Sequence, residues 1–192
     1  MQSALAADPS NPAVHRALAL FYIVSKRAPE AEPHFKALTD EPSGELALAD
    51  YYIGLGRSEQ AGTVLQTLAQ NTTHRDSRAA RLRLAAIDYR TGRKADAYRV
   101  VDEILTEKPA YADARIAKAR MLLLDGGDLD EAEKHVREAI TADRGLPSAH
   151  YTLGLVAPQR RDTTAAERAF REVLKLNPRA GAAQLQLARL QL

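Results

Sequence analysis

A small residue recurs at nearly constant intervals along this 192-residue chain, and no other feature constrains its fold as strongly. In order, the recurring residues are Ala31, Ala61, Ala97, Ala132 and Ala166, which lie 30, 36, 35 and 34 positions apart. An apolar residue follows each alanine four positions later, and another follows seven positions later. Both offsets fall on one stripe of an α-helix, so each alanine marks a helix with a buried face. A period of this length is typical of stacked repeats.

A second small residue stands twelve or thirteen positions before each alanine, so that each unit contains two helices that approach closely. These residues are Ala19, Ala49, Ala85, Ala119 and Gly154. Gly56, Gly92 and Gly126-Gly127 lie between the two helices of a unit, where a left-handed residue ends a helix. Prolines, which cannot continue the preceding helix, separate the units. They are Pro9, Pro42, Pro109 and Pro178.

The composition also favours helices, because 36 Ala and 25 Leu outnumber 8 Val and 6 Ile, the β-branched residues that strands prefer. We therefore predict an all-α protein. Its helices are expected at residues 12–26, 31–39, 43–55, 58–70, 75–91, 93–107, 111–125, 128–142, 147–157, 162–176 and 180–191.

The order of residues within a unit resembles the tetratricopeptide repeat (TPR). A leucine and a small residue, a turn glycine, the second-helix alanine, an aromatic or apolar residue and a final proline follow one another as in that family. The fifth unit matches best, with Leu153, Gly154, Ala166, Phe170 and Pro178 at family positions. The resemblance implies a right-handed α-solenoid of stacked antiparallel helix pairs, the TPR superhelix.

The chain departs from the family pattern at three places in the repeat, one of them Lys118, which replaces the leucine of the fourth unit. The family's tryptophan is absent, and its position is taken by His15, Glu45, Arg81, Arg115 and His150. Lys26 and Arg161 stand where the turn glycine of the first and fifth units belongs. Such degeneracy is normal in the family, and the fold prediction is unchanged.

We interpret the chain as a single array that forms part of a longer one. Residues 1–11 match the tail of a preceding repeat, and residues 181–192 match the first helix of a sixth. Five repeats lie between them, at residues 12–41, 42–77, 78–111, 112–146 and 147–180. Arrays normally finish with polar caps, whereas the last segment carries Leu185, Leu187 and Leu190. Exposed array ends of this kind also allow self-association.

Prolines break the local rules in two segments. An interior proline costs a helix about 3 kcal/mol, so the second helix of the first unit should begin near Ala31, with Pro33 in its first turn. Pro158 follows Ala157 inside a predicted helix, which should therefore end early or kink and lead into an irregular turn at residues 159–161.

The sequence offers no enzymatic site, metal site or cofactor site. Without cysteine, thiolate chemistry is excluded, and no two of the five histidines have helical metal-ligand spacing. His34 and His135 fall at equivalent points of second helices and are expected on the outer surface. The acidic segment at residues 125–131 lacks the order of a calcium loop, and a turn with Asp128 as N-cap explains it. We predict a non-enzymatic protein without metal or cofactor.

Charge is concentrated in the middle of the chain. Residues 75–99 contain eight basic and three acidic residues, although the net charge of the whole chain is only +2. A solvated helix surface explains part of this segment, and an acidic ligand near Arg83 and Arg90 is the alternative. No stretch approaches the roughly 20 apolar residues of a membrane span, and we expect no nucleic-acid partner. The chain is expected to be soluble, and both the bacterial cytoplasm and the periplasm are consistent with its sequence.

The resemblance also implies a binding surface, because the first helices of a TPR array line a concave groove that takes peptides. Carried over by position, with Arg83 added from the basic segment, the candidate residues are Arg16, Leu20, Ile23, Leu46, Asp50, Ile53, Leu82, Arg83, Ala86, Tyr89, Arg90, Ile116, Arg120, Leu123, Tyr151, Leu155, Leu185 and Arg189. Chaperone-binding members of the family hold a terminal carboxylate with Lys and Asn in this groove. None of the candidates is Lys or Asn, so we do not expect that ligand.

The function predicted from these observations is a non-catalytic scaffold that binds a peptide or helix of a partner protein in the groove. An assembly or regulatory arm of a larger multidomain protein, such as a bacterial envelope or exopolysaccharide system or an enzyme, is the main alternative. A helical-repeat RNA binder is more remote, because such a protein needs stacking aromatics and basic residues along the entire groove.

Overall fold

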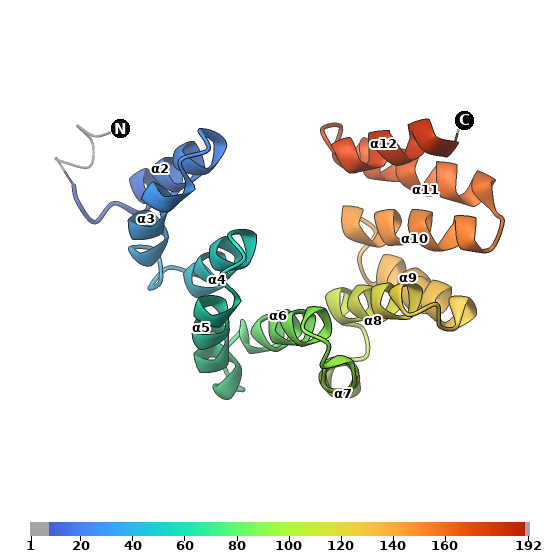
Figure 1. Ribbon diagram of the computed structural model, residues 1–192, viewed down its shortest axis with the longest axis horizontal. Helices are drawn as coiled ribbons and strands as arrows, with labels where there is room; N and C mark the ends of the chain where they lie inside the picture. Colours follow the sequence, from blue (N-terminus) through green and yellow to red (C-terminus); the bar gives the residue numbers. More distant parts are fainter. Residues whose placement is uncertain (1–7, 191–192) are drawn as a thin grey trace. The chain divides into compact units, whose positions relative to one another are not determined.

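The computed structural model describes residues 8–190, and every regular element within them is a helix (Figure 1). Helices that follow one another in the chain pack in pairs, so the predicted all-α solenoid of helix pairs is confirmed. The chain folds into two compact units, Met1–Ile87 (unit 1) and Asp88–Leu192 (unit 2). The predicted tail of a preceding repeat lies largely outside the described residues.

Unit 1 opens with α2 (Pro12–Val24), whose N-cap is Asn11. The Asn11 side chain accepts hydrogen bonds from the N–H groups of Ala13 and Val14, which would otherwise lack partners at the helix start. The following elements are η1 (Ala28–Ala31), a 3₁₀ helix, then α3 (Glu32–Lys36), α4 (Gly44–Gly54), α5 (Ser58–Gln70) and α6 (Ser77–Arg90). Apolar residues of α4 and α5, among them Leu46 and Leu65, form the core with Tyr51 and Tyr52.

Unit 2 contains the last residues of α6 and six further helices. These are α7 (Lys94–Glu107), α8 (Ala112–Leu124), α9 (Leu129–Ala142), α10 (Pro147–Gln159), α11 (Thr163–Leu176) and α12 (Gly181–Leu190). Each helix from α7 to α11 packs on the next, and α8 also contacts α10. We call α2, α4, α6, α8, α10 and α12 the first helices, and the η1–α3 segment, α5, α7, α9 and α11 the second helices.

The five alanines that define the repeat are fully buried at helix crossings. Ala31, Ala61, Ala97, Ala132 and Ala166 have no exposed surface. The glycine of the first-helix series shows why these positions must be small, because a Cβ atom on Gly154 would lie 2.6 Å from the Phe170 ring. The register inferred from the sequence is therefore confirmed at these positions.

The turn between the two helices of a unit has one geometry, whether or not it contains glycine. Lys26, Gly56, Gly92, Gly126 and Arg161 all have positive φ, between 58° and 90°. The next N–H group donates to the carbonyl five residues before it in every case, as from Arg27 to Tyr22 (2.8 Å) and from Asp162 to Ala157 (3.0 Å). This is the Schellman pattern. Lys26 and Arg161 adopt the glycine conformation at an energetic cost.

Two local predictions need correction. The second helix of the first unit has Pro33 in its first turn, as predicted, but a 3₁₀ turn precedes it and it ends at Lys36 rather than at residue 39. The first helix of the fifth unit does not end early, because α10 continues through Pro158 to Gln159. Pro158 lies in the last turn, where it removes only one hydrogen bond before the helix ends, and the turn after it is regular.

Three of the five residues at the family's tryptophan position donate a hydrogen bond to the preceding loop. His15 is buried, and its Nε2–H donates to the carbonyl of Pro9 at 2.9 Å. Arg115 Nε donates to the carbonyl of Pro109 (2.6 Å), and His150 Nε2–H donates to that of Arg144 (3.0 Å). In each case the acceptor lies six residues upstream. A side-chain N–H at this position thus satisfies a loop carbonyl without tryptophan.

The expected outer-surface location of His34 and His135 is wrong. His34 is partly buried, and its Nδ1 lies 3.0 Å from Nδ1 of His15. His135 keeps only 15% of its side-chain surface exposed, and its Nδ1 lies 3.3 Å from Nη1 of Arg115. Both rings therefore pack between the two helices of their own repeat, against the residue at the tryptophan position.

Candidate partner-binding surface

The first helices carry most of the exposed large apolar side chains in residues 8–190. These side chains are Leu20, Phe21, Ile23 and Val24 on α2, Leu124 on α8, Leu185 on α12, and Leu176 on the second helix α11. The exposed fraction reaches 63% for Leu20 and 72% for Leu124. Six of the seven side chains thus lie on first helices, where the candidate residues were placed.

In unit 1 the candidate residues differ widely in accessibility. Arg16, Leu20, Ile23, Asp50 and Ala86 are exposed, and Ile53, Leu82 and Arg83 are partly buried. Leu46 is buried in the core, so we remove it from the candidate surface.

A groove of about 220 Å³ lies in unit 1, lined by residues of α2, α3, the following turn and α4. Leu20, Phe35 and Leu38 supply apolar surface, and Arg16 and Glu41 supply charge. Because Arg16 Nη2 lies 2.8 Å from a Glu41 carboxylate oxygen, this charge is balanced within the protein. The groove can therefore take an apolar side chain of a partner.

The basic residue Arg83 of α6 also has a carboxylate partner within unit 1. Its Nε and Nη2 atoms donate to the two carboxylate oxygens of Asp50 on α4, at 2.6 and 2.8 Å. This fork-like pairing is the geometry in which arginine would hold a ligand carboxylate. For Arg83, Asp50 already supplies the carboxylate that a ligand would otherwise provide.

In unit 2 the candidate residues come from four first helices. Arg90, Arg120, Leu185 and Arg189 are exposed, and Tyr89, Leu123, Tyr151 and Leu155 are partly buried. Ile116 is buried in a core cluster with Ala139 and Ala149, so it too leaves the candidate surface.

Tyr89 is part of a hydrogen-bonded network around Asp125. The Asp125 carboxylate accepts from the hydroxyls of Tyr89 (2.7 Å) and Tyr98 (3.0 Å) and from Lys94 Nζ (2.5 Å). Burial and the hydrogen bond to Asp125 raise the pKa of Tyr89 to about 12, and the Lys94 and tyrosine hydrogen bonds lower the pKa of Asp125. Tyr89 therefore joins α6 to the end of α8. Asp125 and Tyr98 were missed because they become neighbours only when α7 and α8 pack.

Arg120 has no carboxylate partner among residues 8–190. Its Nε donates to Thr152 Oγ1 on α10 at 3.0 Å, and the Thr152 hydroxyl donates to the carbonyl of Ser148 at 2.8 Å. Because Thr152 is fully buried, this hydrogen bond holds the guanidinium against a fixed group. Burial lowers the pKa of Arg120 although the residue remains exposed, and Tyr151 acts in the opposite direction. Thr152 was missed because nothing in the sequence separates it from an ordinary core threonine.

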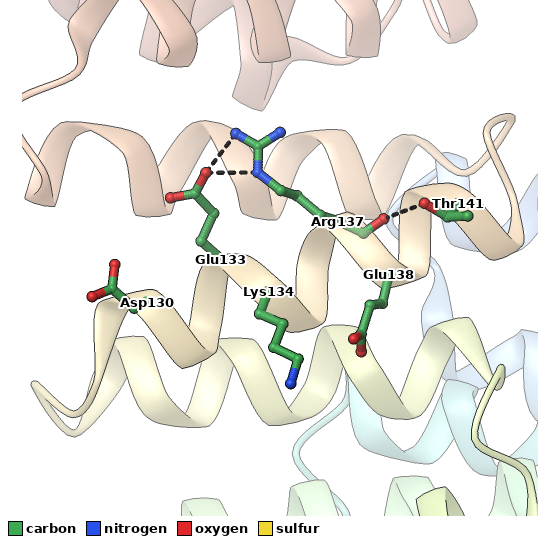
Figure 2. Close-up of a pocket in the computed structure, with 6 residues that line it drawn as sticks. All are labelled: Asp130, Glu133, Lys134, Arg137, Glu138 and Thr141. Atoms are coloured by element: carbon green, nitrogen blue, oxygen red, sulfur yellow. Dashed lines mark hydrogen bonds and ion pairs between the residues drawn. The ribbon is translucent and has the colours of Figure 1, made fainter.

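Carboxylates are distributed unevenly between the helices of unit 2. Helices α10 and α12 contain no Asp or Glu, whereas α9 contains four such residues, Asp130, Glu131, Glu133 and Glu138. A shallow recess on α9 is drawn in Figure 2, where Glu133 pairs with Arg137 at 2.7 Å. Arg160 also pairs with Glu133 at 3.1 Å. This recess has mixed charge, and its arginine is already paired.

The described residues hold no group of three or more potential metal ligands. Their helices are also too short or too polar to cross a bilayer.

Comparisons with known proteins identify the same repeat. The model of the tetratricopeptide repeat matches residues 46–112, 89–147 and 151–192. No curated protein sequence matches the chain.

Solved structures with the same fold include TPR proteins. The thermophilic TPR protein TTC0263 of Thermus thermophilus is 18% identical, with a TM-score of 0.70 over 94% of this chain and 99% of that chain. The Cut9–Hcn1 hetero-tetramer of APC/C is 16% identical, with a TM-score of 0.72 over 98% of this chain and 38% of that chain. YrrB, a TPR protein with an unusual peptide-binding site, is 14% identical, with a TM-score of 0.53 over 96% and 95%. The family model covers well over half of the sequence, and we conclude that the chain belongs to the tetratricopeptide repeat family.

Proposed function

We propose that this chain is a non-catalytic scaffold that binds a peptide or a helix of a partner protein on the exposed surface of its first helices. The TPR fold is a scaffold for protein–protein interaction, which supports the general class. The observation that carries the proposal is the uneven distribution of exposed large apolar side chains in residues 8–190, six of which lie on first helices and one on a second helix. Apolar surface left in water is typical of interaction sites.

The exposed apolar residues occur in both units. In unit 1, Leu20 borders a groove of about 220 Å³ that can receive a partner's apolar side chain. In unit 2, Leu124 and Leu185 are exposed on α8 and α12. Interface cores typically combine such apolar anchors with arginine and tyrosine. In unit 2, Arg120 lies on α8 with Leu124, and Tyr151 lies on α10, which packs against α8.

The proposal is tested by selecting peptides from a random 16-residue display library on the immobilised full chain and measuring their affinities for variants. Leu20→Glu or Leu124→Glu should weaken binding at least about tenfold, because each places a charge where an apolar side chain docks. Leu176→Glu is the matched control, since Leu176 is exposed on the second helix α11.

Circular dichroism and thermal melting establish that each variant is folded. Peptides that lose affinity for Leu176→Glu but not for Leu20→Glu or Leu124→Glu would move the binding surface to the second helices. Failure to select any peptide would also contradict the proposal.

A further inference from the structure

We propose that Arg120 and Tyr151 form an anchor in unit 2 for a side-chain carboxylate of an acidic partner peptide. This inference rests on the proposed function and adds to it the chemistry of the ligand. It also moves acidic recognition from Arg83, where the sequence placed it together with Arg90, to a different arginine.

Arg120 is held in one direction by a hydrogen bond from Nε, while its terminal nitrogen atoms remain available to a ligand. Its only hydrogen bond within residues 8–190 runs from Nε to Thr152 Oγ1, at 3.0 Å. Thr152 is fully buried and its hydroxyl is held by the Ser148 carbonyl, so this contact fixes the direction of the guanidinium. The two terminal amino groups, Nη1 and Nη2, keep their donors for a ligand. A pair of parallel N–H donors is the arrangement with which arginine binds a carboxylate.

The other two cations of α8 have carboxylate partners, whereas Arg120 has none among residues 8–190. Arg115 pairs with Glu138 of α9, and Lys118 pairs with Asp102 of α7 at 2.7 Å. Both acids stand on second helices. Arg120 contacts α10 instead, which contains no Asp or Glu. Among the three cations of α8, Arg120 is therefore the one without a counter-charge within residues 8–190.

The surroundings of Arg120 strengthen its attraction for a carboxylate. Partial burial disfavours the charged form and lowers the pKa of Arg120, yet the residue stays exposed. An arginine that is partly desolvated and still accessible gains more from an incoming carboxylate than a fully hydrated one, since its attraction is less screened. Tyr151 precedes Thr152 on α10, next to the residue that holds Arg120, and its hydroxyl has no hydrogen-bond partner within residues 8–190. It can donate to the same carboxylate.

The apolar residues near Arg120 and Tyr151 favour an internal acidic residue of a peptide as the ligand. Leu123 and Leu124 follow Arg120 on α8, and Leu155 follows Tyr151 one turn later on α10. Apolar surface thus accompanies the charge along both helices, which suits an Asp or Glu flanked by apolar residues. One arginine and one tyrosine supply donors for a single carboxylate.

The test uses capped peptides, acetylated and amidated so that they carry no terminal carboxylate, selected from a random 16-residue library on the full chain. We expect the enriched peptides to share an Asp or Glu next to apolar residues. Replacing that acid by Gln should reduce affinity about tenfold or more, the effect of losing a charge-assisted hydrogen-bond pair. Arg120→Gln should cause the same loss, and the two changes combined should cause no further loss.

Further variants distinguish an anchor from a merely structural arginine. Arg120→Lys keeps the charge but not the fork and should recover only part of the affinity, and Thr152→Val should weaken acid-dependent binding by releasing Nε. Arg168→Gln, at an exposed arginine of α11, is the matched control and should bind like the wild type. Melting curves show whether each variant is folded.

Several results would overturn the inference. One is enrichment of peptides without an acid, whose binding nevertheless requires Leu124, because the proposed function would then stand and the carboxylate anchor would fail. Another is acid dependence that survives in Arg120→Gln. A third is tight binding of phosphoserine peptides with no binding of their Glu counterparts, which would make phosphate the ligand. Failure to enrich any peptide would overturn both proposals.

Discussion

The two units use the same helix pairs, but the arginines of the candidate surface are paired differently in them. In unit 1, Arg16 pairs with Glu41 and Arg83 with Asp50, both carboxylates supplied by the same unit. In unit 2, the hydroxyl of Thr152 is the one hydrogen-bond partner of Arg120 in the part of the chain that the structure describes. The difference shows that a basic residue in a candidate groove indicates a ligand charge only when the fold does not already provide the opposite charge.

Substitutions at the buried alanines, which both units contain, should change the free energy of unfolding most. Ala61→Leu in unit 1 and Ala97→Leu in unit 2 each force a larger side chain into a fully buried helix crossing. We expect each to lower the free energy of unfolding by about 1–3 kcal/mol through overpacking, as measured by urea denaturation. The matched control is Ala95→Leu, at an exposed position of α7. An unchanged midpoint for Ala97→Leu would contradict the register of the repeat.

Glycine substitutions at the turn residues should change the free energy of unfolding by less, and should raise it, in both units. Lys26 and Arg161 hold φ values of 58° and 60°, which glycine adopts without steric cost. Lys26→Gly and Arg161→Gly should each stabilise the protein by about 0.5–1 kcal/mol, as measured by the same urea titration. Gly56→Ala, at φ 73°, is the reverse control and should destabilise. Destabilisation by both glycine variants would mean that these side chains make contacts worth more than the strain.

The contrast in charge pairing can itself be tested by removing the internal carboxylate of unit 1. Asp50→Asn takes the counter-charge from Arg83 and should let it attract an acidic ligand. We expect the affinity of a capped acidic peptide to rise about threefold at low salt, with the gain lost at high salt because exposed charges are screened. Fluorescence anisotropy at two salt concentrations measures this change. A drop in affinity would show that Asp50 contributes to binding.

Acidification should have the smallest effect, and it should act on both units. Burial lowers the pKa of His34, with His15 adding to the shift, and burial followed by Arg115 lowers the pKa of His135. The unfolded chain then binds protons more readily than the folded one, so these contributions to stability are complete above about pH 6.5 and decline as the pH falls below it. The melting temperature should therefore fall between pH 7.5 and 5.5, and less so in His34→Asn with His135→Asn. An equal decline in the double variant would refute this origin.

The sequence predicted the fold well because the repeat is a set of small residues at fixed intervals, and close helix packing requires them. The five alanines and the five turn positions were all located in this way, including Lys26 and Arg161. The 3₁₀ turn that precedes α3 and the path of α10 through Pro158 were not, because local proline rules do not include the neighbouring turns.

The candidate surface was predicted less completely than the fold. Helical position placed Arg120 and Tyr151 on first helices, but it also included Leu46 and Ile116, whose burial depends on packing against neighbouring helices. The partners of Arg83, Arg120 and Tyr89 lie between 32 and 36 residues away in the chain. Pairings at such separations depend on how successive repeats stack, which single-residue patterns do not encode.

The central claim is that unit 2 leaves Arg120 available to a partner carboxylate whereas unit 1 satisfies Arg83 internally. Isothermal titration of a capped acidic peptide, selected on the wild-type chain, into Arg120→Gln and Arg83→Gln compares the two arginines directly. We predict that Arg120→Gln loses at least about tenfold in affinity and that Arg83→Gln stays within about twofold of the wild type. Wild-type affinity in Arg120→Gln, or an equal loss in Arg83→Gln, would contradict the claim.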